Sequence, residues 1–193
     1  MSKTTRLAIF VTGSGTNCEN IIRHFQGQQD VEISIVISSR SDAYALVRAK
    51  NLGVPTEVIT RAQLLDEPRK VLQAVRGCDY IILAGFLPKI PIYLIDLFPN
   101  RIINIHPALL PKFGGKGMWG HHVHEAVKAA GEKRSGITIH FVNPELDEGE
   151  HIAQFSCKLL PTDTPDDIAA KVHELEMKHY PQVIEQVIRR NIV

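Results

Sequence analysis

The chain is poor in cysteine and in net charge, and each shortage excludes a class of protein. Its 3 cysteines among 193 residues lie far apart and form no Cys-x-x-Cys pair, which argues against a disulfide scaffold or a zinc site. Its 22 lysines and arginines are balanced by 21 acidic residues, which leaves a net charge of +1. This balance does not favour a nucleic-acid partner or a membrane surface, so a local site must hold any bound anion.

Long apolar runs are also missing. No stretch approaches the ~20 apolar residues that a membrane-spanning helix requires. Residues 1–6 lead directly into a short apolar segment, without the apolar core of a secretory signal. We therefore expect a cytoplasmic protein that has no membrane partner.

Strand-like and helix-like segments alternate through the first half of the chain. Short apolar runs predict buried strands over residues 7–11, 31–38, 57–59, 80–84 and 101–105. Apolar residues at helical spacing predict helices over residues 18–26, 43–51, 68–75 and 91–97. This order predicts an α/β fold with a Rossmann-like, mostly parallel twisted sheet and helices on both faces.

The second half follows a different pattern. A loop with four glycines precedes a predicted helix over residues 122–130, and two strand-like segments follow at residues 137–142 and 152–159. We expect these two strands to pair as an antiparallel addition to the sheet in the C-terminal half. Thr164, a proline and two aspartates then mark the start of a final helix, with a bend at Pro181. No repeat or composition break divides the chain, so we expect one domain over residues 1–193.

The first motif is Gly13-Ser14-Gly15-Thr16-Asn17, between the first predicted strand and helix. Glycines allow close backbone approach, and free N–H groups at a helix N-terminus attract phosphate. Cys18 stands where a dinucleotide-binding Gly-x-Gly-x-x-Gly motif has its third glycine, so the motif favours a monophosphate. The alternative is an ordinary strand-to-helix turn, in which Thr16 or Asn17 only caps the helix.

The second motif is Asn104-Ile105-His106-Pro107, at the end of a predicted strand. Asn104 and His106 are two residues apart, so their side chains leave the same face of the strand. If the fold brings Asp147 back to this strand end, an amide, an imidazole and a carboxylate could stabilise an oxyanion and move a proton near neutral pH. Alternatively, His106 only bonds to the backbone and Asp147 only forms a turn.

A third group, His121, His122, His124 and Glu125, has the spacing of helical neighbours and invites a metal interpretation. No second cluster in the sequence supplies obvious further ligands. We therefore expect no metal here, and a solvated or substrate-facing start of a helix. Trp119 lies in the preceding loop as either a mobile cover or a buried anchor.

Several stretches match one known family in order and spacing over essentially the whole chain. They are Gly13–Asn17, Leu83-Ala84-Gly85-Phe86, Asn104 to Pro111, Gly136 to Phe141, Leu146-Asp147-Glu148-Gly149 and Tyr180-Pro181. Together they resemble the phosphoribosylglycinamide formyltransferases (GAR transformylases) of the formyltransferase superfamily. The Asn-x-His-Pro stretch with the later aspartate is specific to that superfamily, and the glycine loop narrows the resemblance toward a phosphorylated small substrate.

The resemblance implies a transferase of one-carbon metabolism that acts in the third step of de novo purine synthesis. It would move a formyl group from 10-formyltetrahydrofolate, the co-substrate, directly to the amine of phosphoribosylglycinamide, with no metal. His106, as an imidazolium, would stabilise the tetrahedral oxyanion and deliver a proton. Asp147 would orient that ring and favour its charged form, and Asn104 would donate a hydrogen bond to the oxyanion.

The resemblance also implies where the small-molecule substrates bind. Phosphoribosylglycinamide would contact Gly15, Thr16, Asn17, Pro107 and Glu176. The folate would contact Leu87, Pro88, Lys89, Ile90, Asn104, Asn143, Pro144 and Glu145. The expected assembly is a monomer or a homodimer. Two departures from the family pattern are a longer, glycine-rich segment over residues 112–121 and a lysine at position 89, where an arginine is frequent.

Three alternatives compete with this interpretation. A formyltetrahydrofolate deformylase uses a similar trio with water as acceptor, but normally carries a regulatory domain ahead of its first strand. A formyltransferase acting on initiator tRNA would need a further C-terminal domain. A non-catalytic small-molecule sensor would not need an intact set of Asn104, His106 and Asp147.

Overall fold

The computed structural model describes residues 4–190. The chain divides into two compact units, residues 1–103 and residues 104–193. Within residues 4–190, seven strands follow the order β3-β2-β1-β4-β5-β6-β7, and β5 (Ile102–His106) passes from the first unit into the second. Each unit is described by itself, and the prediction of one domain over residues 1–193 stays a prediction.

The first unit holds a parallel sheet, because β1 pairs in parallel with both β2 and β4, and β2 with β3. These strands are β1 (Thr5–Val11), β2 (Val31–Ser38), β3 (Thr56–Val58) and β4 (Tyr80–Leu83). The apolar run of β1 is fully buried from Leu7 to Val11. Such continuous burial is typical of a parallel strand that is covered on both faces.

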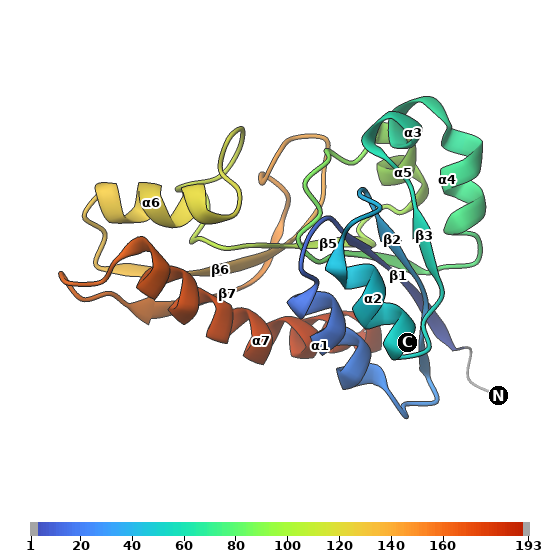
Figure 1. Ribbon diagram of the computed structural model, residues 1–193, viewed down its shortest axis with the longest axis horizontal. Coiled ribbons are helices and arrows are strands. Elements are labelled where there is room, and N and C mark those ends of the chain that lie inside the picture. The colour runs from blue at the N-terminus through green and yellow to red at the C-terminus, as the bar shows by residue number, and fades with distance from the viewer. Residues whose placement is uncertain (1–3, 191–193) are drawn as a thin grey trace. The chain divides into compact units, whose positions relative to one another are not determined.

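Helices lie around these strands (Figure 1), namely α1 (Thr16–Phe25), α2 (Tyr44–Asn51), α3 (Arg61–Asp66), α4 (Pro68–Ala74) and α5 (Ile92–Leu97). Sequence periodicity missed α3, since six residues carry too little pattern. Its start was nevertheless encoded, because Thr60 and Gln63 form a capping box in which the side chain of each bonds to the backbone N–H of the other.

The second unit contains the end of β5 and four further elements, α6 (His121–Ala129), β6 (Arg134–Phe141), β7 (His151–Lys158) and α7 (Pro165–Arg190). Strands β6 and β7 pair antiparallel, and α7 packs against both of them and against α6. Thr164 caps α7 as predicted, since its hydroxyl accepts from the backbone N–H of Asp167 at 3.2 Å. Pro181 lies buried inside α7.

The predicted fold class is confirmed: the sheet is mostly parallel, with an antiparallel addition in the C-terminal half and helices around it. The main differences lie at element ends. Helix α1 begins at Thr16, two residues before its predicted start, because Gly15 adopts a left-handed conformation (φ 77°) directly before it. Across residues 4–190, no helix combines the length and the apolar character that crossing a membrane requires.

Candidate active site

Strand β5 carries the first two candidate residues at its C-terminal end. Ile103 is completely buried, whereas Asn104 is half-buried and projects from the opposite face of the strand. His106 follows on the same face as Asn104 and is only 4% exposed. Pro107 ends the strand, because it has no backbone N–H to donate to a neighbouring strand.

Asp147 reaches His106 from the loop between β6 and β7. Its Oδ2 lies 3.6 Å from His106 Nδ1 and accepts a hydrogen bond from the backbone N–H of Gly115 at 2.9 Å. Asp147 has φ 58°, a left-handed conformation that aspartate tolerates better than most residues. The structure therefore brings together the imidazole and the carboxylate of the predicted trio.

The other nitrogen of His106 faces a backbone oxygen. Nε2 donates a hydrogen bond of 2.7 Å to the carbonyl of Phe113, which lies in the glycine-rich segment over residues 112–121. An oxygen atom therefore lies near each ring nitrogen of His106, the carbonyl of Phe113 beside Nε2 and the carboxylate of Asp147 beside Nδ1.

Sequence reasoning missed His140, which lies on β6 and completes the cluster. Its Nδ1–H donates to the carbonyl of Phe141 at 2.8 Å, and its Nε2 accepts a hydrogen bond of 3.1 Å from the Asn104 side-chain amide. The same Nε2 lies 3.7 Å from Asp147 Oδ1. Asn104 is therefore held through one amide N–H, and its second N–H has no partner among the described residues.

A signal for His140 was present in the sequence. Thr138 and His140 alternate with apolar residues on β6, so two polar side chains share one face of a buried strand. Thr138 also organises the backbone beyond the catalytic motif: its hydroxyl donates to the carbonyl of Ala108 at 2.7 Å and accepts from the N–H of Leu110 at 3.0 Å. This contact fixes the chain as it leaves His106.

Burial lowers the pKa of His140 below its ordinary value of 6.5, although hydrogen bonding to Phe141 and the charge of Asp147 oppose the shift. Burial likewise lowers the pKa of His124. As the pH falls below about 6.5, these rings take up protons in the unfolded chain but not in the folded one. The stability present above that pH is therefore lost as the pH falls toward the depressed folded-state pKa values.

We accordingly expect urea denaturation to give a smaller free energy of unfolding at about pH 5.5 than at about pH 7.5. Each such histidine contributes at most about 1.4 kcal/mol per pH unit. In His140→Gln the slope of stability against pH should be smaller than in the wild type. An unchanged slope would contradict a neutral, buried His140.

The first unit holds the predicted phosphate and pterin segments, at the C-terminal ends of β1 and β4. Gly15 allows no side chain, because an added Cβ would lie 2.4 Å from Cβ of Ala45. The backbone N–H of Leu87 donates to the hydroxyl of Thr12 at 3.0 Å, so the two segments adjoin. Thr16 and Asn17 form the first residues of α1, beside Gly15.

The remaining predicted folate contacts differ in exposure. Leu87 and Lys89 are exposed, Pro88 is partly exposed and Ile90 is buried. In the second unit, Asn143 shapes the loop that carries Asp147, since its Oδ1 accepts from the backbone N–H of Glu145 at 3.0 Å. Pro144 and Glu145 are exposed there.

The second unit also holds Pro107 and Glu176, the two remaining predicted contacts of the amine substrate. Pro107 is partly exposed, directly after His106. Glu176 lies on α7 with its Oε2 3.2 Å from Nδ1 of His173, and this bond raises the pKa of that histidine.

The histidines at the start of α6 do not gather into one cluster. His121 and His122 are exposed and each lies within ion-pair distance of Glu125, whereas His124 is buried. In residues 4–190, no three histidine, cysteine or acidic side chains are arranged to hold a metal ion. Trp119 is 51% exposed and contacts His122 edge to face, so it is not a buried anchor.

Comparison with known proteins places the chain in a family. The formyl transferase family profile matches residues 5–184. The chain is 37% identical to a chloroplastic phosphoribosylglycinamide formyltransferase of Arabidopsis thaliana, over 97% of this chain and 66% of that protein. Its identity to the phosphoribosylglycinamide formyltransferase of Haemophilus influenzae is 34%, over 93% of this chain and 85% of that protein.

Solved structures of phosphoribosylglycinamide formyltransferases also match this chain. Phosphoribosylglycinamide formyltransferase from Anaplasma phagocytophilum matches with a TM-score of 0.87 and 32% identity, over 97% of this chain and 89% of that one. The Bacillus halodurans enzyme matches with a TM-score of 0.86 and 30% identity, over 95% of each chain. The chain spans slightly less than two thirds of the length of the two chloroplastic relatives, 66% and 62%. It belongs to the formyl transferase family.

Proposed function

We propose that the chain transfers a formyl group from 10-formyltetrahydrofolate to the amine of phosphoribosylglycinamide. The observation that carries the proposal is the cluster of His106, Asp147, Asn104 and His140 at the end of β5. Membership of the formyl transferase family supports formyl chemistry. The names of the Arabidopsis and Haemophilus relatives support this amine substrate.

In the proposed reaction the amine nitrogen attacks the formyl carbon, and the carbonyl oxygen becomes an oxyanion. The free N–H of Asn104 and the imidazolium of His106 stabilise that charge, while Asp147 balances the charge of the ring. The intermediate then collapses: the bond from carbon to N10 of the folate breaks, and N10 receives a proton from His106. The attacking amine releases one proton to solvent and His106 takes one up from solvent, so the transfer balances without an oxidant or a reductant.

One contact has to change during this cycle. The hydrogen on Nε2 of His106 is occupied by the carbonyl of Phe113, and Nδ1 faces Asp147. We therefore propose that the Phe113 carbonyl moves away when substrate binds, which frees the Nε2 hydrogen for the oxyanion and then for N10. Glycines at positions 114, 115 and 117 follow Phe113 and give this segment the backbone freedom that the movement requires.

The substrate contacts belong to the same proposal. The N-terminus of α1, with Gly15, Thr16 and Asn17, suits the ribose phosphate because the N-terminus of a helix attracts an anion. Pro107 and Glu176 would contact the glycinamide end. Residues 87–90, Asn104 and residues 143–145 would line the folate site. A cytoplasmic location and a monomeric or dimeric state stay predictions.

The proposal is tested by incubating the purified chain with 10-formyltetrahydrofolate, with and without phosphoribosylglycinamide. We expect the formyl donor to be consumed only with the amine present, with formation of one formylated product per donor. Equal consumption without the amine would replace the proposal with a hydrolase. No consumption in either mixture would favour a non-catalytic binding protein. N-acetylated phosphoribosylglycinamide, which lacks the free amine, is the matched control.

A further inference from the structure

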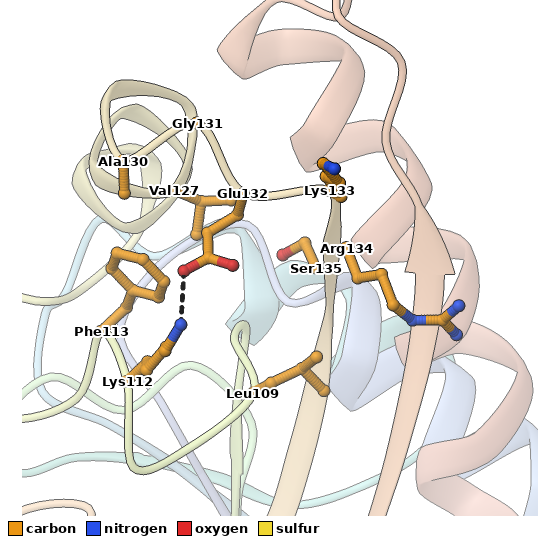
Figure 2. A pocket seen from close by; sticks show the side chains of 10 residues that line it. All are labelled: Leu109, Lys112, Phe113, Val127, Ala130, Gly131, Glu132, Lys133, Arg134 and Ser135. Carbon is orange, nitrogen blue, oxygen red and sulfur yellow. Dashed lines mark hydrogen bonds and ion pairs between the residues drawn. The ribbon is translucent and has the colours of Figure 1, made fainter.

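A cavity of about 580 Å³ opens in the second unit, between the end of α6 and the start of β6 (Figure 2). None of its lining residues is among the substrate contacts proposed above. They are Leu109, Lys112, Phe113, Val127, Ala130, Gly131, Glu132, Lys133, Arg134 and Ser135. Its volume falls within the range of small-molecule sites, and its lining is largely apolar, as such sites usually are.

One polar group in this wall lacks a partner. Ser135 is only 2% exposed, and among the residues that the structure describes no group forms a hydrogen bond with its hydroxyl. Figure 2 shows this hydroxyl on the side of Ser135 that faces the cavity. A buried hydroxyl without a partner carries a free-energy cost, which a ligand with a matching polar edge would remove.

Four charged residues line the cavity, and three of them, Lys112, Lys133 and Arg134, are exposed to solvent. Lys112 Nζ and Glu132 Oε1 are 2.7 Å apart, so these two charges satisfy each other. Arg134 extends away from the cavity (Figure 2) and donates to the hydroxyl of Ser156 at 2.5 Å. The buried lining residues Val127 and Ser135 carry no charge, so the inner part of the cavity favours an uncharged ligand over a strongly anionic or cationic one. The ring of Phe113 supplies a flat wall suited to an aromatic partner.

The cavity is joined to the candidate active site by one residue. The side chain of Phe113 lines the cavity, and its backbone carbonyl accepts the hydrogen bond from Nε2 of His106. Phe113 itself has φ 57°, a left-handed conformation that is unfavourable for a bulky residue. A ligand that shifts the Phe113 ring would move the attached carbonyl, and with it the partner of the imidazole.

We propose that this cavity binds a small, uncharged, planar heteroaromatic molecule that stacks on Phe113 and hydrogen-bonds to Ser135. Binding displaces the Phe113 carbonyl and so changes the environment of His106. The site is separate from those for the folate and the amine substrate. It does not depend on the proposed transfer reaction, because the test below uses no substrate and a failed formyl-transfer assay would leave it standing.

The test is a titration of the purified chain with benzimidazole near neutral pH, followed by nuclear magnetic resonance of backbone amides and of ¹³C-labelled histidine rings. The ring signal of His106 is assigned by its absence in His106→Asn. We expect saturable shifts at the amides of Gly131 and Ser135 and at the His106 ring. Benzoate and benzamidine, which are similar in size but charged, should bind at least tenfold more weakly.

Two neighbouring alanines provide a matched pair of variants. Ala130→Leu fills the cavity and should weaken binding at least about tenfold, whereas Ala129→Leu, one residue outside the lining, should leave it unchanged. Ser135→Ala should weaken binding several-fold. The proposal is overturned by equal losses in the two leucine variants, by equal binding of the charged compounds, or by binding that leaves the His106 signal unmoved.

Discussion

His106→Asn is expected to lower kcat for formyl transfer by about 10²–10⁴-fold, the usual contribution of a positioned general acid. Asparagine can still donate a hydrogen bond, but it cannot carry a positive charge opposite Asp147 or release a proton to the leaving nitrogen. The rate should therefore lose one of the ionisations that shape the wild-type dependence of kcat on pH. Steady-state kinetics with both substrates, across the neutral pH range, measures both effects.

Asn104→Ala is the comparison that separates the two roles. Removing one oxyanion donor should lower kcat by about 10²–10³-fold, yet the pH dependence should keep its shape, because His106 is still present. Circular dichroism of both variants is the control that tests whether they are folded. An active His106→Asn variant with an unaltered pH profile would remove the role assigned to the imidazole.

Gly149→Ala is expected to have the largest effect on stability, with a loss of about 3 kcal/mol or more in the free energy of unfolding. An added Cβ would lie 1.7 Å from the carbonyl oxygen of Phe141, a backbone atom with little freedom to move. The same two stretches are joined by a hydrogen bond of 2.9 Å from the N–H of Phe141 to the carbonyl of Glu150. The substitution must push these stretches apart, and Asp147 is two residues away.

Gly27→Ala is the matched control, because an added Cβ there meets no atom within 4 Å and only the positive φ of 86° is unfavourable. Its cost should stay near 1 kcal/mol. Urea denaturation of both variants gives the two values. If Gly149→Ala were no less stable than Gly27→Ala, close backbone packing would not be what requires glycine at position 149.

Much of the fold could be predicted because its buried strands are encoded as short apolar runs. The only polar group among the side chains of Leu7–Val11 and Tyr80–Leu83 is the hydroxyl of Tyr80. The burial of these two strands is therefore evident without a structure. Helix α3 was not predicted, because a six-residue helix has little periodicity and its capping box went unnoticed.

The candidate site likewise has features that the sequence alone shows and features that only the structure shows. Asn104 and His106 share a face for a local reason, the alternation of side chains along a strand, and the sequence alone shows this. The approach of Asp147 was expected only from resemblance, since some forty positions separate it from His106. The hydrogen bond from His106 to the carbonyl of Phe113 had no sequence signal. It depends on the path of a loop, and main-chain oxygens are the same in every residue.

The glycine-rich segment contacts the candidate catalytic residues His106 and Asp147 through main-chain atoms, the carbonyl of Phe113 and the N–H of Gly115. Main-chain contacts of this kind do not depend on which side chain the residue carries. The side chains of residues 116–119, and even the length of that stretch, can therefore vary as long as the N–H of Gly115 still reaches Asp147 and the carbonyl of Phe113 can still approach and leave His106. A glycine-rich segment that is longer than the family pattern is therefore compatible with unchanged main-chain contacts to His106 and Asp147.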